Sequence, residues 1–134
     1  MLNTELNQLM QAATNDAITY AAEEHRITLD NSLSSLSRLD TILSELHQRE
    51  KQQKHSDELI FTLCNIFGAY VGTLFINSLG GEWRHNAEQS VPSVYVQYAD
   101  KEFPFASICY HKIVTDNTIS LTDYVTQAMT NAMQ

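Results

Sequence analysis

The sequence predicts an α+β fold: N-terminal helices and a central buried helix packed on a small antiparallel three-stranded sheet with C-terminal helices. Two changes in the hydrophobic pattern lead to this prediction. Up to Gly81 the apolar residues recur every three to four positions, which is typical of amphipathic helices; the period then falls to two, which is typical of half-buried strands. Helical spacing returns after Phe105. Helices and strands therefore occupy separate parts of the chain, as in α+β proteins.

Composition and charge limit the function classes. The 134 residues suit a single domain, 1–134, and 43% of them are hydrophobic while only 4 are Gly and 2 are Pro. The formal net charge is −8, which repels nucleic acid and anionic membrane surfaces and attracts basic partners. The sequence begins without a basic segment followed by an apolar one, so we expect no secretory signal and a cytoplasmic location.

Residues 1–50 are expected to form a helical hairpin. Thr4 is the expected N-cap of its first helix, and Asp30 or Asn31 that of its second. The second helix carries apolar residues near heptad spacing, although too few heptads are present to predict a coiled coil. We call this set the leucine seam: Leu33, Leu36, Leu39, Leu43 and Leu46.

The segment 57–80 is predicted to be the core helix. The run from Leu59 to Gly81 contains no charged residue, and its apolar residues have helical periodicity. Ser56 or Asp57 is the expected N-cap. The run is long enough to cross a bilayer, but it contains several polar residues, and the flanking amphipathic elements need an apolar partner. We therefore expect a buried helix of a soluble protein and no membrane insertion.

Glycines mark two features of this helix. Gly68 and Gly72 are four residues apart on one face, which lets another part of the backbone approach closely. The pair Gly80 and Gly81 is expected to end the helix.

The segment 82–104 is predicted to be a β-meander. A turn is expected over 86–90 and a tight turn over 99–101, because both segments are polar. The expected strands are Glu82–His85, Val91–Tyr98 and Glu102–Pro104.

The segment 105–131 is predicted to form C-terminal helices. The first is expected over Phe105–Val114, followed by a break over 115–117. Ser120 is the expected N-cap of the last helix.

Motifs in the second half support a family resemblance. Residues 68–72 read G-x-Y-x-G and residues 79–83 read L-G-G-x-W; alternating strands, the F-P-F of 103–105 and the S-L-x-x-Y of 120–124 follow. Over about residues 60–125 the chain resembles small bacterial α+β domains that serve as immunity proteins of polymorphic toxin systems, contact-dependent or type VI. The resemblance implies a fold and a toxin partner, and it carries over no catalytic residue.

The sequence predicts neither a metal site nor an active site. The five histidines lack the spacing of paired metal ligands, and no cofactor motif is present. Cys64 and Cys109 lie in apolar segments and are expected to be buried, unreactive thiols rather than a disulfide. We therefore expect a protein that is not an enzyme and needs no cofactor.

The leading hypothesis is an immunity protein that neutralises a cognate, basic toxin domain by stoichiometric occlusion of its active site. An acidic face would steer such a partner. The alternative is a small helical adaptor or regulatory subunit that dimerises through the leucine seam, so the chain is expected to be a monomer or a homodimer. The expected partner-binding residues are Glu23, Glu24, Asp30, Asp40, Glu45, Glu82, Asp100 and Glu102.

Overall fold

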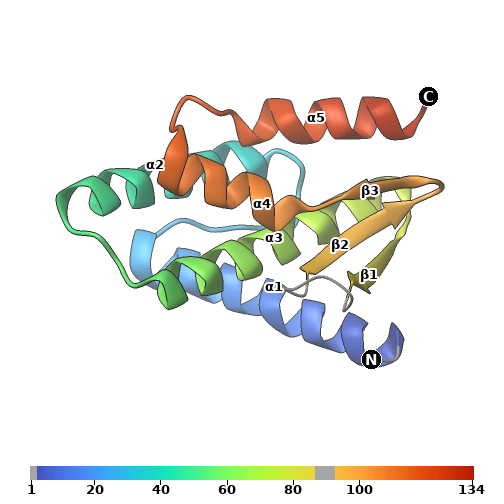
Figure 1. The fold of residues 1–134 in the computed structure, drawn as a ribbon, viewed down its shortest axis with the longest axis horizontal. Helices are drawn as coiled ribbons and strands as arrows, with labels where there is room; N and C mark the ends of the chain where they lie inside the picture. The colour runs from blue at the N-terminus through green and yellow to red at the C-terminus, as the bar shows by residue number, and fades with distance from the viewer. Residues whose placement is uncertain (1–2, 87–92) are drawn as a thin grey trace.

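Helices occupy both ends of the chain, and a short sheet lies between them (Figure 1). The structure is a computed structural model that describes residues 3–86 and 93–134. The predicted α+β class is confirmed. Within the described residues the elements are α1 (Asn3–His25), α2 (Ser35–Gln52), α3 (Asp57–Leu79), β1 (Glu82–Asn86), β2 (Ser93–Tyr98), β3 (Lys101–Phe103), α4 (Phe105–Tyr110), the π-helical turn η1 (His111–Thr115) and α5 (Leu121–Ala132).

The central element is α3, as its uncharged sequence predicts. The side chain of Ser56 caps the helix by accepting a hydrogen bond from the Leu59 amide at 3.2 Å, and Gly80 ends it with φ of +104°. The helix is long and apolar enough to cross a membrane, but 61% of its most apolar window is buried inside the fold. This burial is what a core helix of a soluble protein requires.

α1 packs along α3 in the opposite direction (Figure 1). The hydroxyl oxygens of Thr14 and Thr73 lie 3.1 Å apart, and further along the pair the rings of Tyr20 and Phe67 meet edge to face. Ala17, which is fully buried, lies between these two contacts on α1. Its small side chain allows the close helix approach that the Ala-rich stripe predicts.

The predicted hairpin of the first two helices is wrong. The connection after α1 returns along α3, where the Tyr70 hydroxyl accepts from the Asn31 amide at 2.9 Å and lies 2.7 Å from the Ser35 hydroxyl. α2 therefore starts near the middle of α3 and runs in the same direction as α1 (Figure 1). It packs mainly against η1 and α5, and it meets the end of α1 at the contact between Glu45 and His25. Periodicity identified both helices but could not identify their partners.

The expected cap of α2 is also wrong. The side chain of Asp30 accepts from the amide and the hydroxyl of Ser32 in a local turn, and Asn31 takes a left-handed φ of +66°. The helix begins four residues later, after Ser34, whose side chain makes no cap. An Asp that turns the chain has the same sequence signature as one that caps a helix.

The leucine seam is not available to a second subunit. Four of its five leucines are buried in the core of the chain itself, and only Leu33, at 45% exposure, reaches the surface. Dimerisation through this seam would require the fold to open. Within this fold only Leu33 of the seam is open to a second subunit.

The three strands form an antiparallel sheet in the order β1-β2-β3, as predicted. Trp83, Val96 and Phe103 are in register across the strands and buried, so one face of the sheet covers the core. Pro104 follows β3 instead of ending it. The expected turn over 86–90 falls almost entirely outside the described residues, as does the start of the expected second strand at 91–92.

The C-terminal segment departs from the single helix expected over Phe105–Val114. The α-helix ends at Tyr110 and the backbone continues as a π-turn, closed by a hydrogen bond from the Asp116 amide to the His111 carbonyl at 2.7 Å. Ser120 caps α5 as predicted, accepting from the Asp123 amide at 3.1 Å. At the other end of α5, the Lys101 ammonium donates to the carbonyl of Asn131 at 2.6 Å.

The glycine pair of α3 permits two close contacts. A Cβ built on Gly72 would overlap the Trp83 indole, and one built on Gly68 would lie 2.7 Å from the backbone of Ala106 in α4. Each glycine thus removes a side chain where the sheet or α4 presses on the core helix.

We predict that Gly68→Ala destabilises the protein by about 1–3 kcal/mol. The added methyl group would overlap the backbone of Ala106, which cannot move aside as a flexible side chain can. Chemical denaturation measures the change in unfolding free energy. Asn65→Ala, an exposed site on the same helix, is the control and should be neutral or slightly stabilising. Equal stability of Gly68→Ala and the wild type would contradict the close contact.

Candidate functional site

The structure uses one of the expected acidic binding residues for folding. Asp40, on α2, is partly buried and accepts hydrogen bonds from the amides of Leu121 at 2.6 Å and Thr122 at 3.1 Å, and from the Thr122 hydroxyl. Its carboxylate therefore caps α5 from another helix and interacts favourably with the positive end of the helix dipole. Asp40 is therefore engaged within the fold and is not a free surface charge.

A buried lysine completes this polar cluster. Lys112, only 4% exposed, extends from η1 to the carbonyls of Asn117 and Ile119, with Asp40 3.6 Å away. Nearby, Nδ1 of His47 lies 2.8 Å from the Ile113 carbonyl; since a carbonyl only accepts, that nitrogen carries the proton. The cluster joins α2, η1 and the start of α5.

Three more of the expected acidic residues have partners within the chain. Glu45 lies 2.8 Å from Nδ1 of the His25 ring, and Glu82 lies 2.7 Å from the Arg84 guanidinium. The Ser32 hydroxyl and amide donate to Asp30 and lower the pKa of that carboxyl below its ordinary value. These carboxylates therefore already have partners within the chain.

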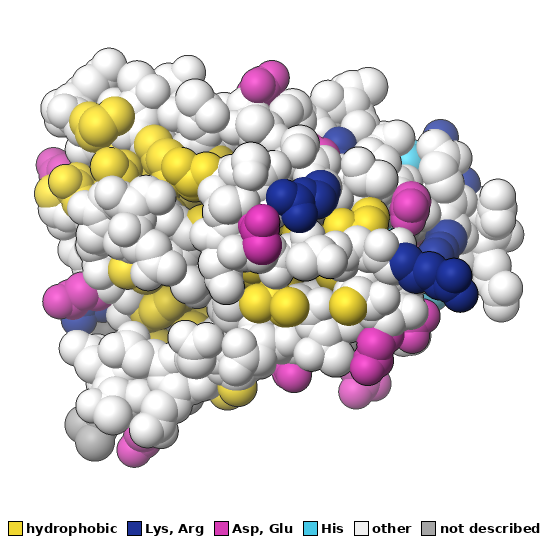
Figure 2. Space-filling model, turned by 180° about the vertical axis from the view of Figure 1, so that it is seen from behind, with side chains coloured by type: hydrophobic (Ala, Val, Ile, Leu, Met, Phe, Trp, Pro, Cys, Tyr) yellow, Lys and Arg dark blue, Asp and Glu magenta, His cyan; other side chains and the backbone are white. Residues whose placement is uncertain are grey.

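The other expected acidic residues do not gather into one face. Glu23 and Glu24 lie at the C-terminal end of α1, whereas Asp100 and Glu102 lie at the β2–β3 turn, at the opposite end of the molecule (Figure 1). On the side seen in Figure 2, Asp and Glu side chains occur as separate spots, several of them beside Lys or Arg. The four acidic residues at these two ends therefore cannot form one binding face.

Both cysteines are buried and free, as predicted. Burial raises the pKa of Cys64 to about 12, and burial also raises the pKa of Cys109 well above its ordinary value. A nucleophilic cysteine requires a lowered pKa and access to substrate, and these thiols have neither. Among the described residues, no group of three or more His, Cys, Asp or Glu side chains is arranged to hold a metal ion.

An apolar cluster lies at the surface near the start of α3, and we call it the aromatic patch: the exposed Phe61 and Val114 and the half-buried Tyr110. The Phe61 and Tyr110 rings are stacked, with centroids 6.1 Å apart and planes inclined by 15°. Phe61 is 57% exposed and Val114 39%. Phe61 thus places an exposed ring on a half-buried one, and a large apolar side chain this open to water is informative because such side chains are usually buried.

Charged side chains surround the aromatic patch. It borders a hollow of about 130 Å³ that Glu50, Lys54 and Asp57 also line. The amide and the ring of His55 hydrogen-bond to Glu50 at 3.0 and 2.6 Å, and they lower the pKa of its carboxyl despite the opposing effect of burial. An apolar centre with a charged rim is the usual anatomy of a protein-binding surface.

Sequence reasoning missed this patch, although a signal was present. Phe61 lies in the uncharged run but off the helical stripe of Leu59, Leu63 and Ile66, so it had to face away from that stripe. Leu59, the first residue of that stripe, is also exposed, so the buried part of the stripe starts further along the helix. Tyr110 gave no such signal, since its approach to Phe61 depends on how α4 crosses α3.

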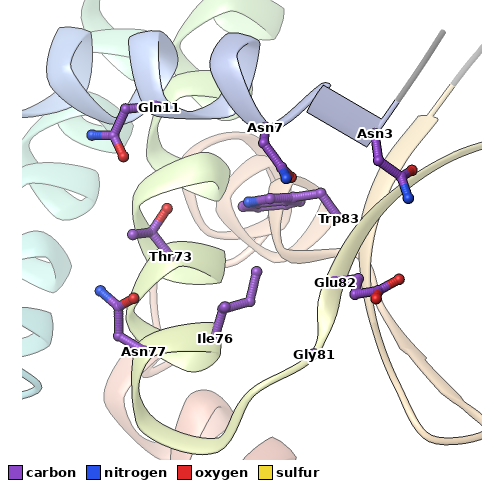
Figure 3. A pocket seen from close by; sticks show the side chains of 9 residues that line it. All are labelled: Asn3, Asn7, Gln11, Thr73, Ile76, Asn77, Gly81, Glu82 and Trp83. Atoms are coloured by element: carbon purple, nitrogen blue, oxygen red, sulfur yellow. The ribbon is translucent and has the colours of Figure 1, made fainter. Parts of the chain in front are cut away.

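A second hollow, of about 300 Å³, lies between the first half of α1, the end of α3 and the start of β1. Its lining is mostly uncharged and polar, and the indole of Trp83 borders it between Asn7 and Ile76 (Figure 3). We call it the amide hollow; its lining residues are Asn3, Asn7, Gln11, Thr73, Ile76, Asn77, Gly81, Glu82 and Trp83.

Comparisons of the chain with protein-family models, with curated proteins and with solved structures found no match. The resemblance to immunity proteins therefore stays a prediction from the motifs of the sequence.

We predict that Asp40→Ala lowers the unfolding free energy by about 2 kcal/mol, because the amides that start α5 lose their acceptor and the Lys112 ammonium loses its counter-ion. Thermal or chemical denaturation measures the change in unfolding free energy. Asp16→Ala, an exposed site on α1, is the control and should change stability by less than about 0.5 kcal/mol. Equal effects of the two substitutions would contradict the capping role.

We also predict that native protein at pH 8 resists alkylation by iodoacetamide. With a pKa of about 12, only on the order of one Cys64 in ten thousand is a thiolate at that pH. Mass spectrometry should find both cysteines modified after unfolding in guanidinium and neither beforehand. Rapid modification of the folded protein would show that a thiol is accessible.

Proposed function

We propose that the chain is a non-enzymatic immunity protein that acts in the bacterial cytoplasm by binding a cognate toxin domain stoichiometrically and blocking its active site. The observation that carries the proposal is the aromatic patch, in which the exposed ring of Phe61 stacks on Tyr110 beside a charged rim. The motif resemblance over about residues 60–125 supplies the class of partner.

The patch has the composition of an interface centre. Aromatic side chains dominate the energetics of protein interfaces, because they bury a large apolar area and lose little conformational entropy. Phe61 and Tyr110 hold each other in place by stacking, so the surface is ordered before a partner arrives. Val114 extends the apolar area from η1.

Charge favours a basic partner. Glu50 and Asp57 line the hollow beside the patch, against Lys54. The whole chain carries a net charge of −8, which accelerates association with a basic surface through long-range attraction. The acidic residues away from the patch thus contribute to steering, even though they form no single face.

The test starts with the gene neighbourhood. The product of a neighbouring gene that stops growth when expressed alone is co-expressed with this protein. We expect growth to be restored and a one-to-one complex to be isolated. Growth arrest despite co-expression, with no complex, would refute the proposal.

The surface is tested by Phe61→Ala, which should weaken toxin binding by about 2 kcal/mol, or roughly 30-fold in Kd, and reduce protection. Isothermal titration calorimetry measures the Kd. Leu33→Ala is the matched control, because Leu33 is also an exposed apolar residue at 45% but lies outside the patch. If Leu33→Ala weakens binding and Phe61→Ala does not, the interface lies elsewhere.

A further inference from the structure

The amide hollow joins two helices that face each other with polar side chains. On α1, Asn3, Asn7 and Gln11 follow one another at intervals of four residues and so share one face of the helix. On α3, Thr73 and Asn77 have the same interval and border the same hollow (Figure 3). The amide residues of this set are exposed and Thr73 is half-buried, so together they form the walls of an open groove between the two helices.

These amides serve no evident structural purpose. Within residues 3–86 and 93–134, no hydrogen bond within the chain engages the side chains of Asn3, Asn7 or Asn77, and Gln11 bonds only to Asn15 on its own helix. Asparagine also forms helices less readily than alanine, so each one weakens its helix slightly. The side chains remain free to donate and accept hydrogen bonds within the hollow.

The inner end of the hollow has a defined acceptor. The Thr14 hydroxyl donates its one proton to the Met10 carbonyl at 2.8 Å, so at the 3.1 Å contact with Thr73 it can only accept. Thr73 therefore donates to Thr14, and its own oxygen keeps a lone pair for a ligand. The lining thus combines amides, which donate and accept, with a hydroxyl oxygen set to accept.

The hollow carries almost no net charge. Glu82 is its one ionisable lining side chain, and Arg84 already pairs with that carboxylate at 2.7 Å. Trp83 and Ile76 add an apolar surface between the polar groups (Figure 3). The indole is 9% exposed and is fixed against Gly72, so it offers a limited, rigid contact area.

We propose that the amide hollow binds a neutral saccharide, with the ring hydroxyls hydrogen-bonded to Asn7, Gln11, Thr73 and Asn77 and the C–H surface of the sugar against Trp83. Hydroxyl groups both donate and accept, as amides do, and a pyranose presents an apolar face that suits an indole. A volume of about 300 Å³ lies at the lower end of small-ligand sites and suits one sugar ring.

This site is independent of the proposed function. Phe61 and the amide hollow belong to opposite halves of α3, so loss of toxin binding would leave sugar binding untouched, and the reverse also holds.

The test uses the single tryptophan of the chain, Trp83, as a reporter inside the site. Glucose, galactose, N-acetylglucosamine and cellobiose are titrated separately while tryptophan emission is recorded. We expect at least one of them to change the emission with a saturable curve. Asn7→Ala and Asn77→Ala should each raise its Kd by about tenfold, since each removes hydrogen bonds to the ligand.

Asn65→Ala is the matched control, because it removes an exposed asparagine of α3 that does not line the hollow, and its Kd should equal that of the wild type. Circular dichroism should show all three variants folded, since alanine favours helix. The proposal is overturned if no sugar gives a saturable change, if Asn65→Ala weakens binding as much as the other variants, or if glucose 6-phosphate binds more tightly than glucose.

Discussion

Every layer of this fold depends on how closely other elements approach α3. At Gly72 the helix has no side chain, and the Trp83 indole occupies that space, which sets the distance between sheet and helix. At Gly68 the backbone of α4 makes a similar approach. Phe75, between these contacts and the sheet, meets the rings of Phe103 and Phe105 and joins the two layers. A core this densely packed transmits any change in α3 to both sides.

Sequence reasoning succeeded where a local pattern determines a local structure. The cap at Ser56, the end of α3 at Gly80 and the meander each follow from residues within a few positions of the feature. The role of the glycine pair could also be anticipated, since a helical face without side chains has few uses other than close packing. For these elements tertiary structure reinforced the local preference.

Sequence reasoning failed where a distant residue decides the outcome. The path of the chain between α1 and α2 depends on the Tyr70 hydroxyl, which binds the connection from α3. Asp40 resembled a surface charge on a polar helix face, and only the position of α5 makes it a cap. Phe61 and Tyr110 are far apart in the sequence, and only the crossing of α4 over α3 stacks their rings at the surface. The expected binding residues were chosen by charge alone, which cannot show whether a carboxylate already has a partner.

The two candidate sites place different chemistry at the two ends of one helix. The aromatic patch lies near the start of α3 and the amide hollow near its end, and 16 residues separate Phe61 from Asn77, which is about 24 Å along a helix. A protein docked on the patch would bury an apolar surface, whereas a ligand in the hollow would satisfy amides that the fold leaves free. The interior of α3 between them is committed to packing against α1, α4 and the sheet. The same helix therefore supports the fold through its middle and leaves its two ends available for binding.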